Sequence, residues 1–295
     1  MITIDEEKCT LCGLCISVCV RRILEPGETS IVVSDPSLCH FCGHCKAVCP
    51  TNAPQFSHLK EGEFESIPEV VEGYEPSAFL RFLRRRRSLR VYQKRPVEEE
   101  KLKMIVEAGR FAPTEVNHQG CEYVVVNGRE TMDRVCSLAI QGFQKKRKWA
   151  EEEMNNLRQG KKTVADEKTL RYYLIVWDRI AKKWKEGVDQ FLHNAPALII
   201  IHIKENLTSS PGVDSGLAAM PMVLMAETLG LGTCINGNVN IAVENSGELR
   251  RFLKIPANHQ VPVAFTVGYP EAKYLRMVAR NPAKIEWINN IPGRS

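Results

Sequence analysis

The most constraining feature of this chain is a cysteine pattern that occurs twice near its start. Eight of the 11 cysteines belong to two segments, CTLCGLCISVC at residues 9–19 and CHFCGHCKAVC at residues 39–49. Both have the spacing C-x2-C-x2-C-x3-C, which is typical of thiolate ligands to iron–sulfur clusters. Three thiolates at steps of three can hold three corners of a cubane, and the fourth then serves the second cluster. The first part of the chain is therefore expected to fold around two clusters.

Zinc is the competing interpretation of this pattern. Zinc sites usually pair two C-x2-C hooks across a longer loop, and they rarely place three ligands at consecutive steps. His40 and His44 lie between the ligands, where they are either solvent-facing loop residues or supports for a ligand. The remaining cysteines belong to no ligand or catalytic motif, and buried structural thiols are expected for Cys121, Cys136 and Cys234.

Residues 1–55 resemble the bacterial-type two-cluster ferredoxins. The resemblance implies one 4Fe-4S cluster on Cys9, Cys12, Cys15 and Cys49, and another on Cys39, Cys42, Cys45 and Cys19. Gly13 and Gly43 would let the backbone approach the sulfur atoms closely. The family usually has proline after each fourth cysteine, and here Pro50 fits while Val20 does not. A ferredoxin unit moves single electrons, so the rest of the chain must use them.

Residues 56–76 predict a linker, because prolines, glycines and acidic residues occur there without a sustained period. A helix is expected next, with Ser77 as its N-cap. The run RRRR at residues 84–87 has three interpretations: a solvated helix face, a phosphate-binding cluster with Ser88, or a nucleic-acid surface. The last is the weakest, because no aromatic residues are interleaved with the arginines and no binding motif surrounds them.

Alternation and apolar runs predict the elements that follow. Strands are expected at residues 121–126, 197–203 and 261–270. Residues 214–230 predict a helix that is apolar on most faces and so is buried on all sides, in a core or a subunit interface. Within the charged segment 141–192, apolar and aromatic residues at helical spacing predict an amphipathic helix around Trp177. Core packing is favoured for its aromatic stripe, with a substrate lid or a pocket wall as the alternative.

Several short phrases occur in a recognisable order, at residues 86–90 (RRSLR), 112–119 (APTEVNHQ), 229–232 (LGLG), 268–270 (GYP) and 280–282 (RNP). Together they resemble the nitroreductase family of FMN-dependent oxidoreductases, over residues 77–290. The resemblance implies an α+β fold in which two chains intertwine and FMN lies at their interface. It assigns the FMN phosphate and ring edge to Arg86, Ser88, Arg90 and Arg280, with Arg87 in the same motif. It places Pro113, Thr114 and Asn117 of the partner chain near the flavin, and Asn236 and Gly237 near its ring.

Two departures from that family concern specificity. Many relatives have proline and an aromatic residue where Gly120 and Cys121 stand here, and an acidic residue is often found at the position of Asn236. These changes retain the flavin pocket but leave the substrate and hydride-donor preferences open. No catalytic acid, base or nucleophile is assigned, because the flavin itself is the reactive group and side chains mainly bind and orient it.

The sequence thus predicts two domains, a two-cluster ferredoxin-like unit at residues 1–55 and a nitroreductase-like FMN unit at residues 77–295. We expect a homodimeric enzyme that passes electrons between the clusters and FMN to reduce a nitroaromatic, a quinone or an activated alkene. The alternative is an electron-transfer or flavin-reduction module that serves a protein partner, and a zinc-stapled nucleic-acid binder is a distant third. Electrons would enter from NAD(P)H resting transiently on the flavin, or from an external ferredoxin or other redox protein.

The same patterns argue against a membrane or secreted location. The longest apolar strings are too short to span a bilayer, and the start of the chain has no basic flank or long apolar run. Clustered cysteines in a reducing compartment favour metal ligands over disulfides. A cytoplasmic protein with no nucleic-acid or membrane partner is therefore expected.

Overall fold

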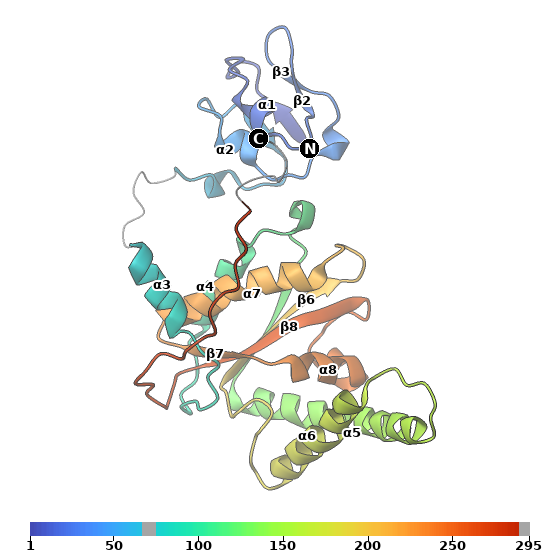
Figure 1. The fold of residues 1–295 in the computed structure, drawn as a ribbon. Coiled ribbons are helices and arrows are strands. Elements are labelled where there is room, and N and C mark those ends of the chain that lie inside the picture. Colours follow the sequence, from blue (N-terminus) through green and yellow to red (C-terminus); the bar gives the residue numbers. More distant parts are fainter. Residues whose placement is uncertain (67–74, 289–295) are drawn as a thin grey trace.

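The computed structural model describes residues 1–66 and 75–288 of the chain. They form two units, a small cysteine-rich one at the N-terminus and a larger one built on a sheet (Figure 1). Part of the predicted linker, residues 67–74, lies outside the described residues, as do residues 289–295.

The small unit consists of two antiparallel strand pairs and two short helices. β1 (Ile2–Ile4) pairs with β4 (Pro54–Phe56), and β2 (Leu24–Pro26) pairs with β3 (Ile31–Val33). The helices are α1 (Leu14–Val18) and α2 (His44–Ala47), and the 3-10 turns are η1 (Pro36–Leu38) and η2 (Glu61–Glu63). The buried apolar cluster is small and includes Cys15 and Cys45 themselves. With so little core, the unit depends on what its cysteines bind.

The chain stays packed against this unit beyond β4. Lys46 is 4% exposed, and its Nζ donates to the carbonyl oxygen of Pro54 at 3.0 Å and pairs with Glu61 at 2.9 Å. The rings of Phe56 and Phe64 stack with their centroids 6.5 Å apart. Residues of η2 are thereby held close to the second cysteine segment.

The larger unit is built on a four-stranded antiparallel sheet in the order β5-β6-β8-β7. Its strands are β5 (Glu122–Asn127), β6 (Ala197–Lys204), β7 (Gly232–Ile235) and β8 (His259–Gly268). β6 is buried on both faces, since Ile199 and Ile201 contact one apolar cluster while Leu198 and Ile200 contact the other. Three of these strands, β5, β6 and β8, confirm the strands expected from the sequence.

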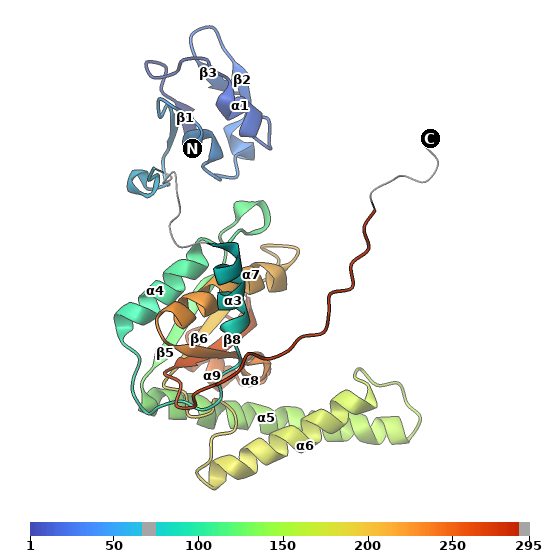
Figure 2. The ribbon, with the colours of Figure 1, turned by 60° about the vertical axis from the view of Figure 1, so that its left-hand side comes forward.

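Helices cover both faces of this sheet (Figures 1 and 2). α4 (Glu99–Arg110) and α7 (Pro211–Thr228) pack on one face, and α5 (Arg129–Arg158), α6 (Glu167–Lys185), α8 (Gly237–Asn245) and α9 (Gly247–Phe252) lie on the other side. α5 and α6 form a long hairpin that projects beyond the sheet in Figure 2. The predicted mixed helix and sheet fold is confirmed.

The aromatic stripe of α6 is core. Trp177 is 1% exposed, and its ring stacks between Tyr173 at 4.2 Å and Phe143 of α5 at 5.3 Å between centroids. The favoured interpretation of this stripe is therefore confirmed over the substrate lid.

One helix prediction needs correction. α3 (Pro76–Arg85) begins one residue before Ser77, and the carboxylate of Glu75 accepts the backbone N–H of Ala78 as the N-cap. Ser77 instead donates its hydroxyl to Glu75.

For α7, the prediction of burial on all sides left a core and a subunit interface open, and a single chain buries only part of the helix surface. Val213, Leu217 and Met220 stay exposed at 59%, 43% and 41% and lie along one face of the helix.

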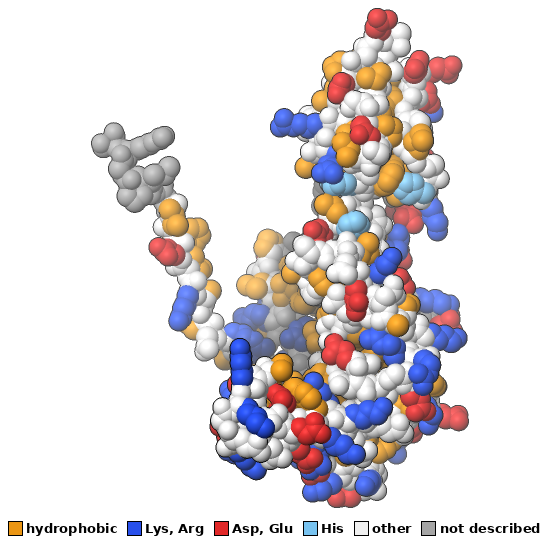
Figure 3. All heavy atoms as spheres, turned by 90° about the vertical axis from the view of Figure 1, so that its right-hand side faces the viewer, with side chains coloured by type: hydrophobic (Ala, Val, Ile, Leu, Met, Phe, Trp, Pro, Cys, Tyr) orange, Lys and Arg blue, Asp and Glu red, His pale blue; other side chains and the backbone are white. Residues whose placement is uncertain are grey.

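Residues 271–288 form an extended C-terminal arm that contains no helix or strand. In Figure 2 it leaves the body of the larger unit and runs away from it. Figure 3 shows hydrophobic side chains along the projecting arm. Its exposed apolar side chains include Leu275, Ile285, Trp287 and Ile288. Burying this much apolar surface requires another molecule or another arrangement of the arm.

Candidate cluster and flavin sites

The eight clustered cysteines gather into two groups that cross between the two sequence segments. Cys9, Cys12, Cys15 and Cys49 line one hollow, and Cys19, Cys39, Cys42 and Cys45 line another. These sets are the same as those implied by the ferredoxin resemblance. His40 and His44 line the second hollow as well, so both of their interpretations stay open.

The two cysteine loops repeat one backbone conformation. Leu11 and Phe41, at equivalent places in the two segments, have φ of 55° and 50°, and Gly13 and Gly43 both have φ of 74°. Such left-handed turns are costly for residues other than glycine, so they indicate a demanding loop geometry. They aim backbone N–H groups at sulfur. Phe41 N donates to Cys39 Sγ at 3.4 Å, and similar bonds reach Cys9 from Ile31 and Cys49 from Ala53.

The thiol environment fits an iron–sulfur cluster. Burial, with Cys42 close by, raises the pKa of Cys45 to about 12, and burial also raises the pKa of Cys15 and of Cys39. Neighbouring thiolates in a buried hollow repel one another unless a cation lies among them. Four sulfur donors per hollow, in the ligand spacing of a cubane, are the donor set of a 4Fe-4S cluster.

A basic hollow lies in the larger unit, between the segment after α3 and the C-terminal arm. It brings together all five predicted residues of the phosphate and ring-edge set, which are Arg86, Arg87, Ser88, Arg90 and Arg280. Lys273 and Arg276 of the arm line the same hollow and were missed by the sequence analysis. The regular spacing of basic residues in AKYLRMVAR, at residues 272–280, could have indicated that they belong with Arg280.

Two glycines of the LGLG motif allow the arginine segment to lie against β7. Leu89 N donates to the carbonyl oxygen of Thr233 at 2.8 Å, and a Cβ on Gly232 would lie 2.5 Å from the Leu89 side chain. Gly230 turns the chain with a φ of 73°, which glycine adopts at little cost. The motif thus positions Ser88 and its neighbours beside the strand that leads to Asn236.

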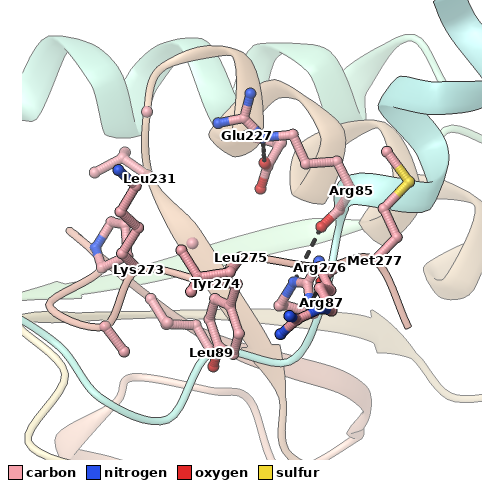
Figure 4. A pocket seen from close by; sticks show the side chains of 14 residues that line it. Arg85, Arg87, Leu89, Glu227, Leu231, Lys273, Tyr274, Leu275, Arg276 and Met277 are labelled. Carbon is pink, nitrogen blue, oxygen red and sulfur yellow. Dashed lines mark hydrogen bonds and ion pairs between the residues drawn. The ribbon is translucent and has the colours of Figure 1, made fainter.

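A cavity of about 450 Å³ lies next to the basic hollow and shares residues with it. Figure 4 shows the side chains that line this cavity. Within it, Arg85 pairs with Glu227 at 2.8 Å. Arg87 donates to the carbonyl oxygen of Arg276 at 3.2 Å and lies over the Tyr274 ring at 4.5 Å. Arg85 and Arg87 are thus engaged by protein groups. By contrast, within residues 1–66 and 75–288 the side chains of Arg86 and Arg90 make no hydrogen bond or ion pair, which leaves their guanidinium groups available to an anion in the hollow that they line.

The structure gives the side chain of Asn236 a structural task. Asn236 is 8% exposed and caps α8 by accepting the N–H of Asn238 at 3.1 Å. Its Nδ2 donates to the carbonyl oxygen of Phe191 at 2.7 Å. Gly237 is the first residue of α8. The predicted approach of these two residues to a flavin ring stays a prediction.

The loop that carries Pro113, Thr114 and Asn117 contacts the cysteine-rich unit. Asn117 Nδ2 donates to the carbonyl oxygens of His40 and Phe41 at 3.0 and 3.1 Å, within the second cysteine segment. Thr114 Oγ1 accepts the N–H of Gln119 at 2.9 Å, and Val116 and Asn117 have φ of 42° and 58°. A β-branched residue in this conformation is an outlier, so contacts hold the loop in this shape. Sequence reasoning missed the contact, because its partners are distant in the chain.

Comparison with known proteins identifies both units. The nitroreductase family model matches residues 83–269, and a 4Fe-4S dicluster domain model matches residues 8–53. The chain belongs to the nitroreductase family. The predicted family of each unit is confirmed, and the matches support the predicted cofactors, FMN and two 4Fe-4S clusters.

Individual relatives resemble one unit each. A putative NADH dehydrogenase/NAD(P)H nitroreductase from Methanothermobacter thermautotrophicus is 24% identical over 195 residues, covering 65% of this chain and 76% of that protein. An indolepyruvate oxidoreductase subunit IorA from Thermococcus kodakarensis is 43% identical over 60 residues, which are 20% of this chain and only 9% of that protein. A nitroreductase with bound FMN from Bacteroides fragilis has the same fold, with a TM-score of 0.54, 21% identity, and coverage of 71% of this chain and 97% of that one.

Among the described helices, none combines the length and the apolar character that spanning a membrane requires.

Proposed function

We propose that this protein is an iron–sulfur flavoprotein oxidoreductase. Electrons pass between the two 4Fe-4S clusters of the N-terminal unit and FMN of the nitroreductase unit, and they reduce an electron-poor small acceptor such as a nitroaromatic, a quinone or an activated alkene. FMN supplies the chemistry, because it exchanges electrons singly with a cluster and in pairs with an organic molecule. The residues of the chain bind, orient and bring the cofactors together.

The contact made by Asn117 carries this proposal. Its amide holds the carbonyl oxygens of His40 and Phe41, which lie between the ligands Cys39 and Cys42 of one cluster. The same loop contains Pro113 and Thr114, which by family position approach the flavin. One short loop thus contacts the cluster segment directly and belongs to the set predicted to line the flavin.

The basic hollow supports binding of the FMN phosphate. Arg86 and Arg90 come from the segment beside β7, and Arg280 comes from the arm. Guanidinium groups match phosphate oxygens through charge-assisted hydrogen bonds, and the Ser88 hydroxyl adds a donor. The additional charges of Lys273 and Arg276 favour the same anion.

An intertwined homodimer completes the proposed site. The exposed face of α7, with Val213, Leu217 and Met220, and the apolar residues of the C-terminal arm are surfaces that a second copy would cover. Predominantly apolar and extended surfaces of this kind are typical of obligate interfaces. Sedimentation should give a dimer for the native chain and a monomer for Leu217→Glu, whereas a monomeric native chain would contradict the interface.

Electrons enter either from NAD(P)H or from an external ferredoxin, and we propose the cytoplasm as the location, since a reducing compartment keeps the ligand thiols available. A donor that delivers one electron at a time would make direct use of the N-terminal unit. Comparing the two donors on the same preparation distinguishes these entry routes.

The decisive experiment removes one cluster and leaves the flavin. In Cys12→Ser we expect FMN to stay bound and its direct chemical reduction to be unchanged. Electron exchange between the flavin and a one-electron protein donor should slow at least about tenfold, equivalent to roughly 1.4 kcal/mol of barrier. Anaerobic stopped-flow absorbance follows cluster and flavin bleaching separately.

Cys121→Ser is the matched control, because Cys121 lies outside both cysteine hollows. If Cys12→Ser exchanged electrons with the protein donor at the native rate, the clusters would not lie on the electron-transfer path to the flavin. Turnover of a small acceptor without any added protein supports the proposal that the chain is an acceptor-reducing enzyme. If a protein with intact cofactors reduced no nitroaromatic, quinone or activated alkene, the electron-transfer module would be favoured.

A further inference from the structure

Three side chains of metal-ligand type meet at one end of the central sheet, away from the cysteine hollows and the basic hollow. They are Glu122 of β5, His202 of β6 and His259 of β8, and their ligand atoms all lie within 4.8 Å of one another. The Nδ1 atoms of the two histidines are 2.9 Å apart, and His259 Nε2 lies 4.0 Å from the Glu122 carboxylate.

The sheet itself sets up this convergence. Glu122 and His202 are direct cross-strand partners, so their side chains lie on the same face. His259, the first residue of β8, pairs with Lys204, two residues along β6 from His202, so it lies diagonally across from His202 on the same face. The pairing of β6 with β8 shifts by one residue between Ile201 and Ile203, and the extra residue belongs to β8, opposite His202. Such bulges are common beside functional sites.

Burial distinguishes the two histidines from the carboxylate. His202 and His259 are 4% and 7% exposed, while the Glu122 side chain is 60% exposed. Burial lowers the pKa of His202, and the nearby Arg250 and His259 act in the same direction against Glu122. The two buried imidazoles present their Nδ1 atoms to each other, and the exposed carboxylate borders the solvent from which an ion would arrive.

We propose that Glu122, His202 and His259 bind a divalent transition-metal ion, with Zn²⁺ as the best match. Three protein ligands, two nitrogens and one carboxylate oxygen, are a common zinc set that leaves a fourth position for water. Nitrogen ligands about 2.0–2.1 Å from one tetrahedral ion lie roughly 3.3 Å apart, so the observed nitrogen pair needs only a small adjustment. Hard ions such as Mg²⁺ and Ca²⁺ prefer all-oxygen sites and fit less well.

The neighbouring charges make Glu122 essential to this site. Arg250 of α9 is held by the carbonyl oxygens of Pro256 and His259, to which its Nη1 donates at 2.9 and 2.7 Å. Its positive charge opposes a cation nearby, and Glu122 is the carboxylate that offsets it. The competing account is a simple hydrogen bond between the two imidazoles, which requires neither the ion nor the carboxylate.

The position suggests what the ion would do. Its ligands come from three neighbouring strands, and Glu122 opens β5 directly after the loop that carries Asn117. A bound ion would therefore fix the end of the sheet from which that loop leaves. This role is structural and independent of the cluster and flavin chemistry.

The test adds Zn²⁺ to the cluster-loaded and FMN-loaded protein without oxygen, then removes loose metal by gel filtration. We expect about one zinc per chain and a higher Tm. X-ray absorption at the zinc edge should show nitrogen and oxygen neighbours at about 2.0–2.1 Å, and no sulfur shell at about 2.3 Å, which separates this site from the cysteines. The iron content should be unchanged.

Variants decide between the ion and the hydrogen bond. Glu122→Gln keeps the size of an exposed side chain and leaves the histidine pair intact, so it should fold normally, yet weaken zinc binding at least about tenfold. His202→Gln should abolish retention, and the exposed Glu244→Gln is the matched control with native binding. No retained zinc, a sulfur shell only, or equal binding by Glu122→Gln and the native protein would overturn the site.

Discussion

The charges of the basic hollow are supplied by single residues from two distant parts of the chain. Arg86 and Arg90 are fixed through the backbone contact of Leu89 with Thr233. Arg280 belongs to the arm, and within the described residues its guanidinium donates only to the carbonyl oxygen of its neighbour Ala279. A guanidinium group without a competing side-chain partner keeps its donors for a ligand. Arg280 is therefore the residue at which phosphate binding can be tested with least damage to the fold.

We predict that Arg280→Ala weakens FMN binding. Losing one charge-assisted contact costs about 1.5 to 3 kcal/mol, or roughly one to two decades of affinity. Flavin fluorescence during dilution measures the release, and iron content and sedimentation check that the rest of the protein is intact. Arg134→Ala, at the exposed pair with Glu248, should keep native affinity. Equal FMN retention in both variants would mean that the arginines are solvated surface charges and do not bind the FMN phosphate.

At the scale of elements, α6 illustrates how a charged segment contributes to the core. Leu170, Trp177 and Ile180 are its buried residues, and the lysines of its last turn face solvent. Trp177 stacks on Phe143 of α5, and so joins the projecting hairpin to the apolar cluster behind the sheet. The hairpin is thus anchored at one end by aromatic packing.

Trp177→Ala should therefore destabilise the nitroreductase unit. Replacing a buried large aromatic residue with alanine typically costs about 3–5 kcal/mol, and the Tm should fall by several degrees. Tyr172→Ala is the neighbouring control, because Tyr172 is 44% exposed. Differential scanning calorimetry of the two variants measures the effect. A Tm for Trp177→Ala within error of that for Tyr172→Ala would mean that the hairpin packs differently in solution.

Elements with a strong local signal could be predicted from the sequence. β6 corresponds to the predominantly apolar run ALIIIHI because both of its faces are covered, and the resemblance of the cysteine segments to two-cluster ferredoxins implied the crossed sets that line the two hollows. Features that depend on distant partners could not be predicted. The contact of Asn117 with His40 joins residues from different units. The meeting of His202 and His259 depends on the pairing of β6 with β8, whose residues are distant in the chain.

At the scale of the whole molecule, polar contacts made by Asn117 and Arg110 join the cysteine-rich unit to the nitroreductase unit. Asn117 donates to the carbonyl oxygens of His40 and Phe41, and Arg110 of α4 pairs with Glu63 at 3.0 Å. The ion pair is exposed, and such pairs contribute about 0.2–1 kcal/mol each. Together with the two hydrogen bonds, this gives a docking that is specific but weak enough to be reversible.

Loosening this docking should slow electron exchange between clusters and flavin. Asn117→Ala removes two hydrogen bonds, a loss of about 1–3 kcal/mol that corresponds to roughly 5- to 150-fold in a docking equilibrium. We therefore expect about fivefold or slower exchange by anaerobic stopped-flow. Faster hydrogen exchange at residues 40–42 would report the same loosening without any electron transfer.

Asn117 also belongs to the predicted flavin set, so a second pair of variants must separate docking from flavin binding. Glu63→Arg and Arg110→Glu each place like charges together at the contact and should both slow exchange while FMN affinity is unchanged. The double variant restores an opposite-charge pair with the partners interchanged, so it should recover part of the native rate. Recovery is incomplete because Glu107, which pairs with Arg110 at 2.6 Å in the native chain, is left beside a like charge. If Asn117→Ala slowed exchange while the two charge variants did not, the effect would belong to the flavin pocket. The route would then depend on Asn117 as a flavin contact, and the Glu63–Arg110 pair would be an incidental surface contact.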